Sequence, residues 1–425
     1  AACHNFFAGD FRPYLYRTTD GGATWASISA DLPEHGSTYT VGVDHVDPRL
    51  LFVGTMNGVY VSNTDNISWV KLKAGIPESV QVTDLDIQRD EDDLVVATFG
   101  RGVYILDDYS PLRALKPDTL EASAALFPVA DAMMFVEADP MGFPGVGFQG
   151  ASYYSAPNPE VGASISYYVR EDHKSLKERR QDAEKALQEA GKAVDLPDYE
   201  QRKQEAVEED PFLLFVISDD EGQAIRTIKQ AVKAGVQRVV WDFRTSPVGP
   251  ISLSSGGEYV PWEAKEQGYM VPPGDYSVAM YKYQGGSLAQ IGAEQGLQLE
   301  PLNIASIPAE NIDALNEFNS KVADLSRAIS AADAHRGELE KRVPFLEQAV
   351  LNVVPIQEAW LMELSAIRAE LREVNQALNG DGLLVMYEGQ PRMSLKGKTD
   401  LITSSLWVTT SGSTGTFERA YNDAN

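Results

Sequence analysis

The sequence predicts a mainly β chain with a helical C-terminal region. Three observations lead to this prediction. Residues near the N-terminus recur with a period of 44, an alternating apolar and polar pattern returns from Gly162, and the apolar spacing becomes three and four from Pro308. A chain of 425 residues has room for about two to four domains with ample core.

The composition limits the classes of partner and site. With 62 acidic and 36 basic residues the net charge is −26, which disfavours nucleic acid and anionic membranes as partners. Cys3 is the single cysteine, so an internal disulfide and a four-cysteine zinc site are excluded. The five histidines show no paired ligand spacing, and no apolar run approaches the ~20 residues of a membrane span. We therefore expect no cofactor, no metal and no membrane span.

The first landmark is "YRTTDGGATW", which contains the skeleton Thr18-x-Asp20-x-Gly22-x-Thr24-Trp25. Asp and Thr side chains bond nearby backbone donors, and Gly permits a positive φ, so these residues suit a tight turn. A carboxylate beside a hydroxyl can also be catalytic. A second copy of the pattern helps to choose between the two interpretations.

That second copy ends at Trp69, 44 residues after Trp25. Ser68 falls under Thr24, but Thr64 replaces the aspartate and Asn66 replaces the glycine. A third, partial copy repeats the same spacing from Gly58 to Gly102.

Short β-rich runs separated by turn residues fill each period. A period of ~40–50 residues with about four strands is typical of a β-propeller blade. Residues at a fixed phase of every blade serve the blade more often than an active site, so we interpret Asp20 as structural.

The skeleton S/T-x-D-x-G-x-T/S-W resembles the Asp-box of the bacterial neuraminidase (BNR) repeat, which Thr18 to Trp25 matches at every defined position. "LLFVGTMNGVYVS" and "GRGVYILDDYSPLRAL" resemble the last blades of sortilin-like propellers and of bacterial secreted BNR-repeat proteins labelled "glycosyl hydrolase". The resemblance implies an Asp-box turn between outer strands, away from the axis. It also implies a β-sandwich and a helical region after the propeller, and an extracellular, periplasmic or cell-surface location in a bacterium.

Residues 1–115 correspond to the last ~2.5 blades, whereas a closed propeller takes ~4–8. Unpaired strand edges are unfavourable, so we expect the missing N-terminal blades in the same parent protein or on another chain. Residues 116–149, rich in Pro and Gly, form a predicted linker that packs on the propeller.

Residues 150–303 form the predicted fibronectin-like or immunoglobulin-like β-sandwich, with Trp241 in its core. Between its first strands, residues 174–207 are polar and rich in Glu, Lys, Gln and Ala. We predict that this insertion is a helical hairpin, broken near Pro197, whose charges form a solvated face.

Residues 304–425 form the predicted helical bundle. Apolar residues recur at three and four over 312–329 and again over 360–378, and a third helix is expected over about 338–351. The last residues are typical of a helix onset, so the bundle is expected to continue beyond Asn425.

One cluster of charged residues suggests a catalytic or binding site. Arg101, Asp107 and Asp108 flank the last predicted strand of the propeller part. They could supply an arginine and an acid to a central cleft. The favoured interpretation is that Arg101 pairs with one of the aspartates and locks the last blade to the linker.

Asp44, His45 and Asp47 suggest a metal site by residue type. Strand alternation would place Asp44 and His45 on opposite faces, so a turn is the favoured interpretation.

Two functions remain open. The first is a secreted or envelope propeller protein that binds a protein or polysaccharide, with the sandwich and bundle as assembly modules. The second is a sialidase-like or endo-glucanase-like glycoside hydrolase whose catalytic residues lie mostly in the missing blades. We favour the first, because no motif in this chain requires a catalytic function. We therefore assign no catalytic residue.

Overall fold

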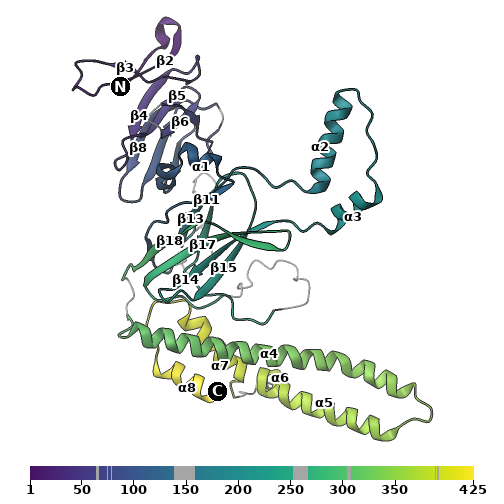
Figure 1. The fold of residues 1–425 in the computed structure, drawn as a ribbon. Coiled ribbons are helices and arrows are strands. Elements are labelled where there is room, and N and C mark those ends of the chain that lie inside the picture. Colours follow the sequence, from purple (N-terminus) through teal and green to yellow (C-terminus); the bar gives the residue numbers. More distant parts are fainter. Residues whose placement is uncertain are drawn as a thin grey trace.

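The N-terminal part of the chain consists of three antiparallel sheets in sequence order (Figure 1). The computed structural model describes residues 1–63, 67–73, 75–77, 79–137, 158–251, 267–303, 308–387, 389 and 392–425. The first sheet has β1 (Ala2–Asn5), β2 (Asp10–Arg17) and β3 (Ala26–Ser27), with the 3-10 helix η1 (Phe6–Ala8) between β1 and β2. The second has β4 (Thr38–Val43), β5 (Leu50–Thr55), β6 (Gly58–Asn63) and β7 (Val70–Lys71). The third has β8 (Val82–Gln88), β9 (Asp93–Thr98) and β10 (Val103–Leu106).

The middle sheet is buried on both faces. All six residues of β5 are buried, because alternate side chains point to opposite sides of the strand. Leu50 and Phe52 pack in a core with β8 and β9, whereas Leu51 and Val53 pack in a core with Leu15 of the first sheet. The three sheets are therefore held together by two apolar layers.

Two further sheets share one apolar core in the middle of the molecule (Figure 1). Trp241 is fully buried in this core and its ring lies 5.3 Å from that of Tyr276. The smaller sheet has β11 (Ala124–Leu126), β13 (Ala163–Val169) and β16 (Gly235–Trp241). The larger has β12 (Ala132–Met134), β18 (Ser287–Pro301), β17 (Gly274–Gln284), β14 (Phe212–Ser218) and β15 (Ala224–Ala231), in that order.

Between β13 and β14 the chain forms two helices, α2 (Leu176–Glu189) and α3 (Tyr199–Val207), which project from the sheets in Figure 1. Ser175 and Asp198 begin them with capping boxes. Arg180 of α2 donates to Glu205 of α3 at 2.6 Å, and neither helix has a buried residue.

A short connection leads from the N-terminal sheets to the middle pair. It contains η2 (Ser110–Ala114) and α1 (Pro117–Glu121). Residues 138–149 of the predicted linker lie outside the described residues, as do 150–157 at the start of the predicted sandwich and Thr64 and Asn66 of the second repeat copy.

The C-terminal region is helical. It contains α4 (Ile312–Leu351), α5 (Glu358–Asn379), α6 (Gly382–Met386), α7 (Leu395–Leu406) and α8 (Gly415–Ala424). The predicted separation of helices over 312–329 and 338–351 is wrong, because α4 is one helix of 40 residues. The intervening "SAADAHRG" is rich in Ala and contains no proline, so nothing in it stops the helix. Among the described residues, no helix is long and apolar enough to cross a membrane.

Candidate functional site

Residues 18–25, hereafter the Asp-box turn, join β2 to β3. Asp20 Oδ1 accepts hydrogen bonds from Thr18 Oγ1 at 2.8 Å and from the Thr24 backbone N–H at 2.9 Å, and Oδ2 accepts one from Thr24 Oγ1 at 2.6 Å. The Gly22 N–H donates to Thr18 Oγ1, and Trp25 Nε1 donates to the Gly22 carbonyl at 3.1 Å. Each polar side chain of the skeleton is thus used inside the turn.

The electrostatics of Asp20 agree with this local role. Hydrogen bonds from the Thr24 hydroxyl, the Thr24 backbone and Thr18 lower the pKa of Asp20 to about 2. A carboxylate held in its charged form in this way is a poor proton donor at neutral pH. Trp25 is 52% exposed, so it covers the turn without being buried.

The second repeat copy obtains its carboxylate from another segment. Asp31, which follows β3, accepts hydrogen bonds from Ser68 Oγ and from the Trp69 backbone N–H, both at 2.8 Å. Trp69 is only 6% exposed, and its Nε1 donates to the Ile28 carbonyl at 2.9 Å. The degraded copy therefore joins the first sheet to the second.

Arg101, Asp107 and Asp108 do not come together. Arg101 lies in the turn before β10 and the aspartates follow that strand. The six residue steps from Arg101 to Asp107 therefore span about 20 Å of extended chain. Within the described part of the chain, Arg101 makes no ion pair with either aspartate.

The predicted pairing by Arg101 is thus wrong. Arg238 of β16, and not Arg101, contacts the segment that follows β10. Its Nη2 donates to the carbonyls of Asp107 at 3.0 Å and Asp108 at 2.7 Å. The Asp108 carboxylate accepts from Ser110 Oγ at 2.5 Å and lies 3.8 Å from Arg238. A side chain from the middle pair of sheets therefore locks the end of the third sheet.

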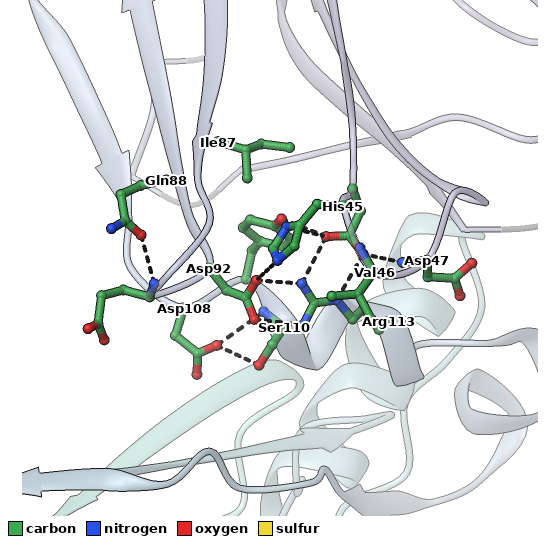
Figure 2. Close-up of polar contacts among 12 residues, drawn as sticks. His45, Val46, Asp47, Ile87, Gln88, Asp92, Asp108, Ser110 and Arg113 are labelled. Carbon is green, nitrogen blue, oxygen red and sulfur yellow. Dashed lines mark hydrogen bonds and ion pairs between the residues drawn. The ribbon is translucent and has the colours of Figure 1, made fainter.

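Five polar residues of the N-terminal part form a set that we call the Arg113 cluster: Asp44, His45, Asp92, Tyr109 and Arg113. The first two follow β4, Asp92 lies in the turn between β8 and β9, and the last two belong to the segment around η2. Figure 2 labels His45, Asp92 and Arg113 of this set. The cluster thus joins the second sheet, the third sheet and the exit segment.

Arg113 bridges the two carboxylates. Its Nε and Nη2 donate to Asp44 at 2.9 and 2.8 Å, and its Nη1 donates to Asp92 at 2.6 Å. Tyr109 Oη donates to Asp44 Oδ1 at 2.6 Å, and the Asp47 N–H donates to Asp44 Oδ2 at 2.7 Å. Each oxygen of Asp44 therefore accepts at least two hydrogen bonds from the protein. This compensates for the burial of the carboxylate, since the residue is only 3% exposed.

The charges of the cluster stabilise one another. Burial alone would raise the pKa of Asp44, but hydrogen bonds from Arg113, Tyr109 and the Asp47 backbone outweigh it and hold that pKa well below its usual range. Burial, followed by the hydrogen bond to Asp44, raises the pKa of Tyr109. Hydrogen bonds to Asp44 and Asp92 raise the pKa of Arg113.

Asp44, His45 and Asp92 also offer ligand atoms within 4.8 Å of one another. His45 Nδ1 lies 3.6 Å from Asp44 and its Nε2 lies 3.5 Å from Asp92. Arg113 already provides the cation between the carboxylates, so a metal ion would have to displace its hydrogen bonds. The arrangement fits an ion-pair network better than a metal centre.

Sequence reasoning singled out Asp44 and His45 but missed Asp92, Tyr109 and Arg113 of this cluster. The alternation argument for Asp44 and His45 does not apply, because both lie beyond the last residue of β4, and Asp44 accepts the Asp47 N–H in a turn. Arg113 lies in "GRGVYILDDYSPLRAL", which was interpreted only as the end of the last blade. Its position between Leu112 and Leu115, in an apolar stretch, was the available signal.

No protein-family model and no curated protein matches this chain. Two solved structures from B. thetaiotaomicron show a weak likeness. One is the extracellular domain of a protein assigned to a hybrid two-component system, with 7% identity over 67% of this chain and 29% of that one, and a TM-score of 0.20. The other, assigned to a one-component system, has 11% identity, coverage of 67% and 28%, and a TM-score of 0.18. The chain spans less than a third of either structure, and likeness at these TM-scores supports no conclusion about fold or function.

Proposed function

We propose that this chain is a binding and assembly protein whose three N-terminal sheets are consecutive blades of an Asp-box β-propeller. In this proposal it works outside the cytoplasm of a bacterium, where it binds a protein or a polysaccharide. The observation that carries the proposal is the face-to-face stacking of successive antiparallel sheets around two apolar layers. The position of the Asp-box turn, between the last two strands of its sheet, supports the proposal.

Strand order supports the blade interpretation. The second sheet runs β4-β5-β6-β7 without a crossover, and β8, β9 and β10 repeat the first three positions of that meander. In an up-and-down blade each strand pairs with its sequence neighbours, and successive blades pack through their faces. The first sheet then corresponds to the last three strands of the preceding blade.

The third sheet has an uncovered apolar face. In β10, Tyr104 and Leu106 pack toward the inner core, whereas Val103 and Ile105 are 63% and 59% exposed. Exposed apolar side chains that are neighbours on one sheet face mark an interaction surface. We assign this face to a further blade, supplied by the parent protein or by another chain.

One observation favours the alternative, a glycoside hydrolase. Burial, and then the nearby charge of Asp93, raise the pKa of Asp107. A carboxyl group with a raised pKa is what a general acid requires. A second carboxylate from another blade would be needed opposite it.

The assembly proposal is tested by light scattering and sedimentation of the wild-type chain and of Val103→Lys/Ile105→Lys. We expect concentration-dependent association of the wild type and a folded monomer for the double variant, because two charges would be desolvated in the contact. Leu288→Lys, at a position 52% exposed on β18, is the matched control and should associate like the wild type. Equal association of all three proteins, or a strictly monomeric wild type, would contradict the proposal.

The alternative has its own assay. Fluorogenic β-glucosides, cellooligosaccharides and sialosides should release no fluorophore above the buffer blank if the chain only binds. Hydrolysis by the wild type that is lost in Asp107→Asn, with unchanged circular dichroism, would establish the hydrolase instead.

A further inference from the structure

Helix α5 has two rows of apolar side chains, and only one of them is buried. In each row an apolar residue recurs every seven positions. The buried row consists of Leu364, Leu371 and Leu378. The second row, which we call the α5 stripe, consists of Trp360, Ile367 and Val374, whose exposed fractions are 46%, 41% and 45%. The described part of the chain therefore covers one row and leaves the other half uncovered.

The uncovered apolar surface extends from α5 onto α4. The two helices pack side by side in opposite directions (Figure 1). Arg368 of α5 donates to Glu347 of α4 at 3.3 Å, so these two residues lie on one side of the hairpin. One step back along each of two antiparallel helices turns both side chains to the same side. Leu346, which is 51% exposed, therefore lies on the same side as Ile367.

The seven-residue repeat indicates the shape of the occupant. In coiled coils and bundles, apolar residues at two positions of each heptad pack against neighbouring helices. The buried leucines of α5 already pack within the described fold, so the α5 stripe is directed to a further neighbour. From Trp360 to Val374 the stripe extends about 21 Å, which a helix of about 14 residues would cover. A strand or a flat lipid surface has no repeat of this period.

Charged side chains flank the apolar surface on both sides. Glu363 and Glu370 are exposed, and each lies three residues after a member of the stripe. Among the described residues neither carboxylate has an ion-pair partner. On α4, Arg342 is exposed four residues before Leu346. A helix on this surface would meet acidic side chains along α5 and a basic side chain on α4.

We propose that the α5 stripe binds an amphipathic helix of a partner protein. The apolar face of that helix packs on the stripe, its basic flank lies along Glu363 and Glu370, and its acidic flank lies along Arg342. A second copy fits less well, because packing through α5 would bring the glutamates of both copies together and each copy has a net charge of −26. The stripe is separate from the uncovered face of β10, so this inference does not depend on the blade interpretation.

Fluorescence anisotropy with the full chain tests the proposal. The probes are two labelled three-heptad peptides at nanomolar concentration, where they do not self-associate. Both have Ile and Leu at the core positions of each heptad. The mixed peptide has Lys along one flank and Glu along the other, whereas the acidic peptide has Glu along both.

We expect the mixed peptide to bind the wild type at micromolar concentration. The acidic peptide should bind about tenfold or more weakly, because one of its flanks places like charges against Glu363 and Glu370. Equal binding of the two peptides, or no binding of the mixed peptide at submillimolar concentration, would overturn the proposal.

Substitutions in the stripe locate the binding surface. Ile367→Lys/Val374→Lys should abolish binding of the mixed peptide, because two charges would be buried beneath it. Leu196→Lys/Val207→Lys carries the same charge change at positions 85% and 70% exposed, and should bind like the wild type. Circular dichroism of both variants should match that of the wild type. Wild-type affinity of the stripe variant would show that the peptide binds elsewhere.

An exchange of charge tests the assigned flank. Glu363→Lys/Glu370→Lys should reverse the preference, so that the acidic peptide binds more tightly than the mixed one. Glu189→Lys/Glu200→Lys makes the same change in net charge on α2 and α3, and should keep the wild-type preference. An unchanged preference in the first variant, or a reversal in both, would contradict the proposal.

Two further measurements distinguish the other occupants. If self-association of the wild type is lost in Ile367→Lys/Val374→Lys, a second copy occupies the stripe. If the wild type floats with phosphatidylcholine vesicles and this variant does not, a lipid surface occupies it. Either result would overturn the proposal. Val103→Lys/Ile105→Lys should bind the mixed peptide like the wild type, so failure of the assembly proposal and failure of this one give different results.

Discussion

The Arg113 cluster and the pair formed by Asn319 of α4 and Trp407, which follows α7, are both polar and buried, yet they differ in whether their polar atoms make hydrogen bonds. In the cluster, both carboxylate oxygens of Asp44 accept hydrogen bonds from the protein. In the pair, neither Asn319 Oδ1 nor Trp407 Nε1 makes a hydrogen bond among the described residues. A satisfied buried network stabilises the fold, whereas a buried polar atom without a partner lowers the stability of the fold.

The difference lies in the cost of removing a group. Removing one partner of a satisfied buried ion pair leaves a buried charge alone, which is strongly unfavourable. Removing an atom that has no partner costs the fold nothing of that kind. Stability measurements on single variants can therefore distinguish the two sites.

The largest effect is expected for Arg113→Met. This variant leaves Asp44 buried beside Asp92 without the guanidinium that bridges them, so the N-terminal sheets should lose about 3 kcal/mol of stability. Hydrogen exchange of peptides from β5 and β9 measures this loss region by region. Arg12→Met, which removes an exposed pair with Asp10, is the control and should change far less. If β5 and β9 keep their wild-type protection from hydrogen exchange in Arg113→Met, the Arg113 cluster does not stabilise the N-terminal sheets.

The second effect is a pH dependence confined to the cluster. Because the pKa of Asp44 is lowered in the folded state, its contribution is present above the ordinary carboxyl pKa of about 3.9 and is lost as the pH falls below it. The groups facing it are His45, Asp92, Tyr109 and Arg113.

The measurement is the stability of the N-terminal sheets between pH 6 and pH 3. It should fall more steeply in the wild type than in Asp44→Asn, which has no proton to take up at this position. Parallel curves for the two proteins would show that the Asp44 carboxylate gains nothing from its partners.

A smaller effect separates the two copies of the repeat. Asp31→Ala removes the acceptor of the Trp69 N–H and a link between two sheets, whereas Asp20→Ala opens one exposed turn. We expect Asp31→Ala to lower the melting temperature of the N-terminal sheets more than Asp20→Ala does. The reverse order in differential scanning calorimetry would mean that the intact Asp-box turn is the more important of the two.

The smallest effect is expected for Arg101→Ala. Arg101 is exposed and makes no ion pair with its predicted partners in the described part of the chain, so stability should stay within about 0.5 kcal/mol. Arg238→Ala should lower the stability more than Arg101→Ala does, because the two carbonyls that follow the third sheet lose their donor. Chemical denaturation of the two variants side by side gives the comparison, and a larger loss in Arg101→Ala would restore its predicted role.

Local patterns in the sequence predicted much of the secondary structure. "LLFVGTM" and "DLVVATF" contain β5 and β9, because apolar β-branched runs between turn residues pack as strands. The spacing of Ile312 to Ile329 predicted the start of α4, but the absence of a break before residue 338 was missed. The apolar periodicity predicts which face of a helix is buried. It does not predict where the helix ends.

The polar partners could not be predicted because they join distant segments. Asp44 and Arg113 are 69 residues apart, and Arg238 reaches Asp108 across 130. No spacing rule links such positions, since the folding of intervening sheets brings them together. Asp31 is a further case, because the loss of the aspartate in the second repeat copy gave no sign of its replacement.

The length of α4 has a hydrodynamic consequence. A helix of 40 residues extends about 60 Å, which is as long as the whole diameter of a compact protein of 425 residues with its radius of gyration of about 22 Å. With α5 alongside, this hairpin extends well beyond the sheets (Figure 1). Such a particle diffuses slowly for its mass and elutes early from a gel-filtration column, as a globular protein of larger mass would. An elution volume alone would therefore make a single copy resemble a dimer.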